Sequence, residues 1–300
     1  MPLRPLRLIR HVLYGLLMGG ADIIPGVSGG TMALIVGVYE RLVGGLSSGV
    51  SWGLALLRLD LDAARTHWAA VPWGLVLPLG AGILGAIKAG ALIIPDLMAT
   101  YPEQMRGLFL GLVAASLLVP ALRIERLTPL RAGIGLACAG AAFFLTGLPV
   151  LEVEAPGLLR VFLSASVAIC AMILPGVSGA FLLEVLGIYT PTLAALNALD
   201  LPYVLAFATG AAVGLGAFAT LLDWLLDTRH DATMAALVGL IAGALRALWP
   251  YMGAGRSLRL PGSSDPVGSV VLLATLGFAA VAGLLWWERR RSTEAAPSVP

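Results

Sequence analysis

The sequence predicts an all-α integral membrane protein built from inverted-topology repeats, each with one re-entrant helical hairpin and three transmembrane helices. Three observations predict this class. The 300 residues are 59% hydrophobic and 12% charged, with a mean hydropathy of +0.93, whereas soluble domains carry roughly 25% charged residues. Two long apolar segments are broken by the same glycine-rich motif. The arginines gather on one side of the membrane only if both broken segments are hairpins.

The apolar segments come in a recurring order along the chain. They lie at about 11–45, 71–95, 106–121, 131–149, 160–196, 203–226, 233–249 and 268–287. A simple transmembrane helix needs about 20 residues, so the first and fifth segments are too long for a single crossing and the other six are predicted spans. We expect one membrane domain over 1–300, with repeat 1 at 11–149, repeat 2 at 160–287 and a cytoplasmic tail at 288–300. Residues 47–68 mix leucines with charges and predict an amphipathic helix on the inner membrane surface.

The two breaks are copies of each other. They read ADIIPGVSGG at 21–30 and AMILPGVSGA at 171–180, so a constant offset of 150 residues relates them. The identities at this offset are Ala21/Ala171, Ile23/Ile173, Pro25/Pro175, Gly26/Gly176, Val27/Val177, Ser28/Ser178, Gly29/Gly179, Gly37/Gly187 and Tyr39/Tyr189. Each half of the chain is therefore predicted to be one broken segment followed by three plain ones.

The arginines indicate how the broken segments meet the membrane. If both are hairpins that enter and leave on one side, each half crosses three times and both termini share one compartment, called inside. Thirteen arginines then lie inside and four lie outside, against about nine and eight if each broken segment crosses once. The inside set is Arg4, Arg7, Arg10, Arg41, Arg58, Arg65, Arg123, Arg126, Arg131, Arg229, Arg289, Arg290 and Arg291, and the outside set is Arg106, Arg160, Arg256 and Arg259. Since Lys and Arg accumulate in cytoplasmic loops, we predict hairpins and cytoplasmic termini.

The chemistry of the breaks suggests an anion site. Proline and glycine interrupt a helix, and non-helical backbone at membrane depth is tolerated only inside protein or along a wet cavity, so we expect the two breaks to face each other. A new helix should start near Ser28 and near Ser178, with free amides, a hydroxyl and a positive dipole end that suit a phosphate. The candidate phosphate-binding residues at the breaks are Gly26, Ser28, Gly29, Gly30, Gly176, Ser178 and Gly179. The alternative is that PGVSG only forms a tight hairpin tip.

Charged residues within the apolar segments are the next candidates, because intramembrane charge is costly and marks function. Lys88 and Arg246 fall toward the outer halves of their spans and could neutralise a phosphate, although either side chain could instead snorkel to the headgroups. Asp22 and Glu184 lie at or just past the two breaks. They are candidates to carry a proton or a cation, or alternatively to cap a helix and pair with Lys88 or Arg246.

Other polar residues receive structural interpretations. Glu40 and Arg41 are expected to form a solvated pair at the interface, and Asp231 and Thr233 to cap the helix that follows them. Cys138 and Cys170 lack the spacing of a disulfide or metal pair and are expected to be small core residues. We predict no metal, no cofactor and no catalytic residues. The net charge of +2 gives no indication of a nucleic-acid partner.

Three stretches resemble a known family. GGADIIPGVSGGTMALIVGVYERL, AMILPGVSGAFLLEVLGIYTPTL and HDATMAALVGLIAGALRALWPY are similar to the polyprenyl-phosphate transporter family, also called domain of unknown function 368. The resemblance spans about 11–287. It implies a carrier in the bacterial inner membrane that returns undecaprenyl phosphate from the outer to the cytoplasmic leaflet, so that the lipid can be used again.

Two other functions stay open at this point. A secondary transporter of a small soluble anion would share every feature except a lateral opening for a lipid tail. An intramembrane lipid phosphatase would need a histidine at the site, but His11, His67 and His230 lie away from both breaks. For a lipid phosphate that moves inward, the membrane potential opposes the anionic head group. We therefore expect coupling to a proton or to sodium, through Asp22 or Glu184.

Overall fold

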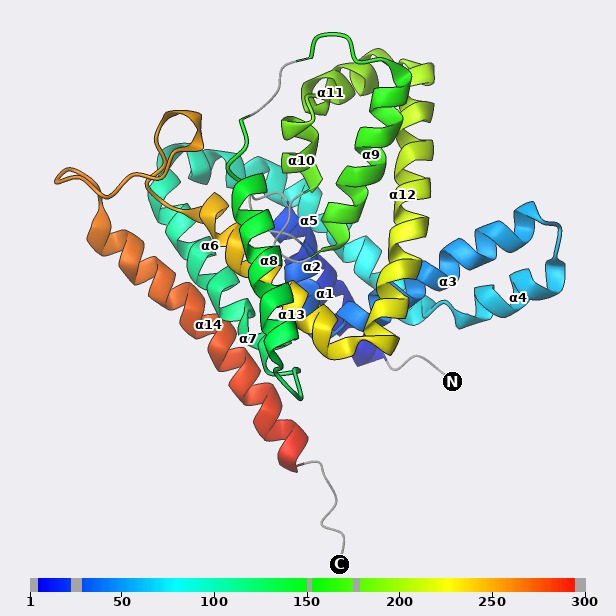
Figure 1. The fold of residues 1–300 in the computed structure, drawn as a ribbon, viewed down its shortest axis with the longest axis horizontal. Coiled ribbons are helices and arrows are strands. Elements are labelled where there is room, and N and C mark those ends of the chain that lie inside the picture. Colours follow the sequence, from blue (N-terminus) through cyan, green and yellow to red (C-terminus); the bar gives the residue numbers. More distant parts are fainter. Residues whose placement is uncertain (1–4, 23–28, 150–152, 175–178, 295–300) are drawn as a thin grey trace, which may run out of the picture.

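The computed structural model describes residues 5–22, 29–149, 153–174 and 179–294. The elements, in order, are α1 (Pro5–Asp22), α2 (Gly29–Ile35), α3 (Tyr39–Leu57), α4 (Leu61–Ala70), α5 (Trp73–Thr100), α6 (Pro102–Ser116), α7 (Leu118–Ala121), α8 (Pro129–Leu145), α9 (Leu158–Ile173), α10 (Gly179–Val185), α11 (Tyr189–Ala198), α12 (Leu201–Thr228), α13 (His230–Ala244), the 3-10 turns η1 (Leu245–Leu248) and η2 (Ala254–Arg256), and α14 (Val267–Glu294). Over these ranges the only β pairing is an isolated bridge between Met252 and Leu258. The expected all-α fold is confirmed (Figure 1).

Several helices are long and apolar enough to cross a membrane. In the part of the chain that the structure describes there are four such helices, at Pro102–Ala121, Leu201–Thr228, His230–Leu248 and Val267–Trp286. The count rises to six if two bent pairs are each taken as one span. Helix α8 has 17 residues and is about 25 Å long at 1.5 Å per residue, somewhat shorter than a typical 30 Å hydrocarbon core. The chain is a multi-pass membrane protein.

The long helices associate in parallel pairs through glycine. In each of four pairs the contacts advance in the same direction along both helices, with α1 beside α5, α6 beside α14, α8 beside α13 and α9 beside α12. One helix of each pair carries two glycines four residues apart, at Gly15 and Gly19, Gly107 and Gly111, Gly239 and Gly243, and Gly210 and Gly214. A Cβ atom at any of these positions would lie within 3.0 Å of the partner helix. Small residues at this spacing let backbones approach closely in membranes.

The two broken segments have the same succession of elements. The short helices α2 and α10 start and end at positions 150 residues apart, and α3 and α11 start at Tyr39 and Tyr189. Each short helix is followed, two residues after its end, by a glycine with positive φ, which is 71° at Gly37 and 77° at Gly187. The hydrogen bonds from Val38 N to Ala33 O and from Ile188 N to Leu183 O, both 2.9 Å long, are those of a Schellman cap. In the second segment the chain bends by 101° between α10 and α11.

The single amphipathic helix expected at 47–68 is wrong in its extent. Two helices, α3 and α4, cover this region and pack against each other. Leu59 adopts a left-handed backbone conformation with φ of 59°, which ends α3. Asp60 then caps α4, since its side chain accepts a hydrogen bond of 2.9 Å from Ala63 N. In Figure 1 the α3–α4 pair extends away from the rest of the helices.

The two short helices differ in how deeply they are buried. Six of the seven residues of α2 are buried, and α2 lies against α1, α6, α7 and α9 in the main hydrophobic core. Helix α10 packs along α9 and toward α11, and Ala180 on its surface is exposed. Figure 1 shows α10 and α11 at the end of the molecule opposite to both chain termini. Of the two short helices, α10 is therefore the more exposed.

Candidate functional site

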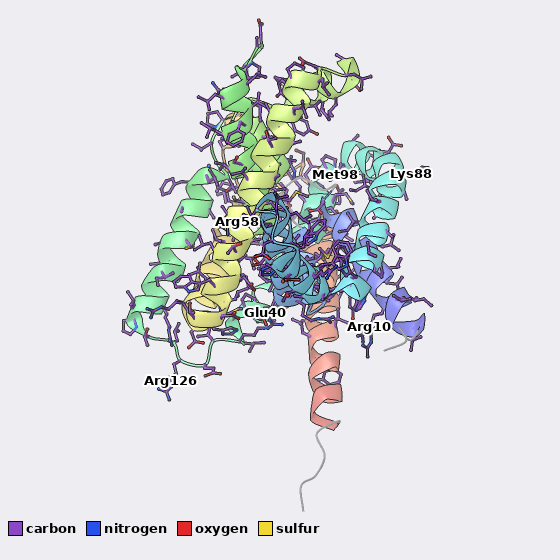
Figure 2. All side chains as sticks on the ribbon, turned by 90° about the vertical axis from the view of Figure 1, so that its right-hand side faces the viewer. Arg10, Glu40, Arg58, Lys88, Met98 and Arg126 are labelled. Atoms are coloured by element: carbon purple, nitrogen blue, oxygen red, sulfur yellow. The ribbon has the colours of Figure 1, made fainter. Side chains whose placement is uncertain are left out.

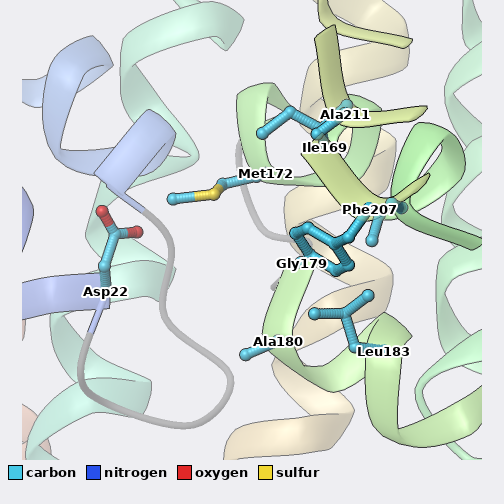
Figure 3. Close-up of a pocket in the computed structure, with 10 residues that line it drawn as sticks. Asp22, Ile169, Met172, Gly179, Ala180, Leu183, Phe207 and Ala211 are labelled. Atoms are coloured by element: carbon cyan, nitrogen blue, oxygen red, sulfur yellow. The ribbon is translucent and has the colours of Figure 1, made fainter. Parts of the chain in front are cut away.

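A cavity of about 240 Å³ lies where the end of α1 approaches the start of α10. Asp22 contributes from α1, and Gly179, Ala180 and Leu183 contribute from α10. The rest of the wall comes from α9 and α12, through Ala165, Ala168, Ile169, Met172, Phe207 and Ala211. Figure 3 shows the Met172 side chain reaching from α9 toward the Asp22 carboxylate. The cavity thus brings the flanks of both breaks together, and its described wall is apolar apart from Asp22.

Asp22 joins the two sides of the first break. Its Oδ1 accepts a hydrogen bond of 2.6 Å from the backbone N of Gly29, the first residue of α2. The carboxylate therefore satisfies one of the free amides at the start of this helix. The capping role considered for Asp22 is thus observed, and the carboxylate also faces the cavity. A pairing of Asp22 with Lys88 or Arg246 is not among the described ion pairs.

The glycines at the two helix starts allow close packing. A Cβ atom at Gly29 would lie 2.6 Å from Asp22 Oδ2, and one at Gly179 would lie 2.8 Å from the carbonyl oxygen of Ala168. Gly29, Gly30 and Gly179 are all buried. The other predicted phosphate ligands, Gly26, Ser28, Gly176 and Ser178, fall outside the described residues. The structure therefore places the flanks of the predicted cradle and leaves its center undescribed.

Glu184 is paired with a residue that the sequence did not single out. Its Oε2 lies 3.1 Å from Nη2 of Arg256, and the Arg256 guanidinium stacks at 4.3 Å over the ring of Phe181. Arg256 belongs to the loop between α13 and α14, 72 residues away in the chain. The charged residues singled out from the sequence lie within apolar segments, whereas Arg256 lies between two such segments. Only its place on the outer side of the predicted topology pointed to this region.

Arg246 and Lys88 do not line the cavity around Asp22. Arg246 Nη1 donates a hydrogen bond of 3.1 Å to the carbonyl oxygen of Phe143, and its guanidinium lies 4.5 Å from the Phe143 ring. This arrangement places a cation at the C-terminal end of α8, where the helix dipole favours it. Lys88 is exposed on α5, and Figure 2 shows it at the periphery of the molecule.

A second charged cluster joins the start of α3, the 122–128 loop and the starts of α8 and α13. Glu40 at the start of α3 pairs with Arg123 at 2.6 Å, not with Arg41 as expected. Asp231 was expected to cap its own helix, α13. Instead its carboxylate accepts hydrogen bonds from the backbone N of Glu125 and Arg126 and pairs with Arg131 at 2.6 Å. The helix cap is replaced because the 122–128 loop offers free amides that an acid on the neighbouring helix can reach.

The expected cap at Thr233 is wrong for a similar reason. Its hydroxyl donates hydrogen bonds of 3.1 Å to the carbonyl oxygens of Leu225 and Arg229 and therefore ties α12 to α13. A cavity of about 480 Å³ lies beside this corner, lined by Arg131, Arg229, His230 and Asp231 among others. Within the described ranges, no three His, Cys, Asp or Glu side chains gather as metal ligands would. Cys138 and Cys170 are both free and partly buried.

Comparisons with known proteins agree on one kind of protein. A family model described as "Undecaprenyl phosphate translocase-like" matches residues 18–261. The chain is 37% identical over 243 residues to a protein of Vibrio cholerae serotype O1 named polyprenyl-phosphate transporter, with 80% of this chain and 77% of that protein covered. A protein of the same name from Staphylococcus aureus is 26% identical over 260 residues, with 80% of this chain and 86% of that protein covered. No solved structure matches the chain.

Proposed function

We propose that this chain, which belongs to the undecaprenyl phosphate translocase-like family, carries a polyprenyl phosphate across its membrane. Two relatives named polyprenyl-phosphate transporter support this substrate class. The names describe transporters, so the chain is a transporter and not an enzyme. In the finer form of the proposal, the protein lies in the bacterial inner membrane with both termini in the cytoplasm. There it returns undecaprenyl phosphate from the outer to the cytoplasmic leaflet for reuse.

The cavity between α1 and α10 is the observation that carries this proposal. Ile169, Met172, Leu183 and Phe207 give it an apolar wall, and Asp22 and Gly179 place it at the flanks of both breaks. The helices α9 and α12 that form this wall also present exposed apolar side chains, such as Leu163 and Val213. In a membrane these faces meet lipid. An isoprenoid tail could therefore leave the cavity sideways into the bilayer while its head group stays between the breaks.

The proposed phosphate cradle consists of the backbone amides and hydroxyls of the two PGVSG tips. Its members are Gly26, Ser28, Gly29, Gly30, Gly176, Ser178 and Gly179. Helix starts favour anions because the helix dipole is positive there, and a phosphate that uses the Gly29 amide must displace Asp22, which accepts a hydrogen bond of 2.6 Å from it. Neither Lys88 nor Arg246 lines the cavity. We propose that they act as counter-charges for the phosphate at other points on the path of the head group.

The apolar wall favours a lipid phosphate over the two alternatives. A small soluble anion gains nothing from Ile169, Met172 and Phe207, because burial beside apolar groups costs an anion its hydration. The alternative lipid phosphatase would need a histidine at the phosphorus. No histidine is among the described residues that line the cavity. A lipid that is bound without reaction is the function that this arrangement supports best.

The same proposal includes coupling to a cation. Asp22 faces the cavity, and Glu184 lies one residue beyond Leu183 in its α10 wall. Both acids are therefore close to the proposed path of the head group. A proton or a sodium ion bound at either acid would offset part of the charge that moves inward. We propose Asp22 as the main coupling acid, since it belongs to the first break itself.

The architecture that we propose for this function is a pair of inverted repeats, 11–149 and 160–287. The matched bounds of α2 and α10 and the matched glycine turns support a repeat. The pairing of α6 with α14 and of α8 with α13 supports a two-fold exchange of helices between the halves. Such repeats let a transporter expose one central site to each side in turn.

Cysteine labelling tests this topology. In a variant without Cys138 and Cys170, we expect Leu59→Cys and Leu127→Cys to react with a membrane-impermeant maleimide only from the cytoplasmic side. Leu260→Cys should react only from outside. All three positions are well exposed, at 85%, 69% and 84%. If the first two cysteines were labelled from opposite sides, the re-entrant hairpins and the inverted repeat would both be wrong.

Binding of the substrate tests the function itself. The full-length protein in lipid nanodiscs should bind undecaprenyl phosphate, with undecaprenol and inorganic phosphate as competitors. We expect undecaprenol and inorganic phosphate each to compete poorly, because the proposed site needs both the charged head and the apolar tail. Competition by inorganic phosphate as strong as that by the lipid would favour a soluble-anion transporter instead.

A further inference from the structure

The loop between α13 and α14 is a built scaffold. Trp249 Nε1 donates a hydrogen bond of 2.9 Å to the carbonyl oxygen of Arg259, and Gly253 N donates one of 2.8 Å to Ser257 O. An isolated antiparallel β bridge between Met252 and Leu258 joins the two arms of the loop. Hydrogen bonds from Arg259 and from the Gly262 amide lower the pKa of Asp265 to about 2. The Asp265 carboxylate therefore stays ionised at physiological pH, where it pairs with Arg259.

This scaffold presents one arginine at its tip. Gly255 and Arg256 both have positive φ angles, 63° and 61°. A non-glycine residue in this left-handed region costs about 1 to 2 kcal/mol. A free loop would relax out of the conformation, so the hydrogen bonds at the base of the loop must hold Arg256 there. The result is a guanidinium directed at α10 and fixed in place before any ligand arrives.

The contacts of Arg256 place it next to the cavity. Its guanidinium carbon lies 4.3 Å from the centre of the Phe181 ring and the guanidinium contacts Glu184, while Ala180 and Leu183 of the same helix line the cavity. The described hydrogen bond of this ion pair runs from Nη2 of Arg256 to Oε2 of Glu184 and is 3.1 Å long. The side chains of Arg256 and Glu184 are 29% and 37% exposed. The pair is therefore partly exposed, beside the part of α10 whose Ala180 and Leu183 line the cavity and on the outer side of the predicted topology.

We propose that Arg256 binds the phosphate-monoester head group and that the Glu184 carboxylate occupies its guanidinium until the head group displaces it. This inference rests on the proposed function and adds a residue to its site. A guanidinium presents a planar fork of donors that matches phosphate oxygens in pairs. A phosphate monoester has about −1.5 to −2 charges and three acceptor oxygens, so it competes well against one carboxylate held by one contact.

The exchange has a consequence for Glu184. When the phosphate takes Arg256, the Glu184 carboxylate loses the cation that it now contacts. The freed carboxylate is then an anionic ligand that a sodium ion or another cation can take up. Arrival of the head group at Arg256 thereby opens a second cation position at Glu184, in addition to the one proposed at Asp22. This order of events links the binding of the anion to the binding of the cation.

A purely structural ion pair gives the opposite expectation from an exchangeable one. If the pair only fastens the loop to α10, Arg256→Ala and Glu184→Gln each break it and should weaken lipid binding alike. If Glu184 competes with the head group, the two variants should act in opposite directions. The sign of the Glu184→Gln effect on lipid binding therefore decides between them.

The experiment measures equilibrium binding of undecaprenyl phosphate to the full-length protein in nanodiscs, with inorganic phosphate as a second probe. We expect Arg256→Ala to weaken lipid binding about tenfold or more, as loss of a hydrogen bond to a charged group does. Arg256→Lys should restore part of this loss, and Glu184→Gln should tighten lipid binding. Arg123→Ala and Glu40→Gln break a similar pair at the other end of the molecule and should leave lipid binding unchanged.

The outcomes separate this inference from the proposed function. Wild-type binding of Arg256→Ala, or weaker binding in both Arg256→Ala and Glu184→Gln, would overturn the assignment of Arg256 while the substrate stands. A second outcome is that the wild-type protein binds inorganic phosphate as tightly as the lipid while the two variants still act in opposite directions. That result would support Arg256 as the phosphate ligand and contradict the lipid as the substrate. Thermal unfolding of each variant confirms that changes in affinity do not come from loss of the fold.

Discussion

Leucine in place of Gly29 or Gly179 is expected to reduce lipid transport to background in reconstituted vesicles. A Cβ atom at Gly29 would lie 2.6 Å from Asp22 Oδ2, and one at Gly179 would lie 2.8 Å from Ala168 O and 3.1 Å from Met172 Cβ. Each site is the first residue of a short helix whose amides form part of the proposed cradle. A larger side chain must displace either the cap at Asp22 or the packing of α10 on α9, so the helix start moves away from the head group.

A matched glycine provides the control. Gly20 lies on α1 two residues before Asp22, and a Cβ atom there would meet nothing within 4 Å. Gly20→Ala should transport at the wild-type rate, while Gly29→Ala and Gly179→Ala should already lose activity. Each variant is compared at equal amounts of folded protein, as judged by size-exclusion chromatography. Wild-type transport by both leucine variants would exclude a cradle shared by the two breaks.

Asp22→Asn is expected to uncouple transport from an imposed cation gradient and to slow inward movement of the lipid. The head group carries about −1.5 to −2 charges, and each charge is worth about 2.3 kcal/mol per 100 mV of membrane potential. With the inside negative, inward movement of the anion is uphill by several kcal/mol. A concentration ratio of ten supplies only about 1.4 kcal/mol. A cation that moves with the lipid removes most of this difference.

The asparagine substitution separates charge from capping. Asn keeps a side-chain oxygen that can accept the hydrogen bond from Gly29 N, now made by Asp22 at 2.6 Å, and asparagine caps helices as well as aspartate does. The start of α2 should therefore keep its structure while the titratable group is lost. Transport is measured in vesicles with a proton or a sodium gradient imposed in either direction. A rate that ignores both gradients in the wild-type protein, with Asp22→Asn equally active, would rule out coupling through this acid.

The sequence predicts the helical class and the position of the breaks because these depend on local rules. A proline with closely spaced glycines disfavours helix locally, and the repeated Gly37 and Gly187 coincide with the two matching turns that the structure contains. The expectation that the two breaks face each other concerns tips that lie outside the described residues, and the structure shows only that their flanks, at Asp22 and Gly179, line one cavity. These features follow from backbone chemistry and from the absence of water in the membrane.

The partners of the charged residues could not be predicted in the same way. Glu184 meets Arg256, and Glu40 meets Arg123 across 83 residues, because loops fold back over helices far away in the chain. Neither contact has a sequence spacing that could reveal it. The short left-handed turn at Leu59 also went unpredicted, since leucine rarely adopts that conformation. By contrast, the glycine pairs such as Gly107 and Gly111 carry a readable signal for helix association.

The exchange of helices between the two halves has a consequence for biosynthesis. Helices α6 and α8 are made in the first half of the chain, but their close partners α14 and α13 belong to the second half. During translation, the face of α6 that carries Gly107 and Gly111 therefore stays without its partner helix until α14, the last helix, has been inserted. A nascent chain that stalls before α14 would therefore expose unpaired small-residue surfaces to quality-control proteases. Two separately expressed halves, divided near 150–157, should accumulate only when they are produced together.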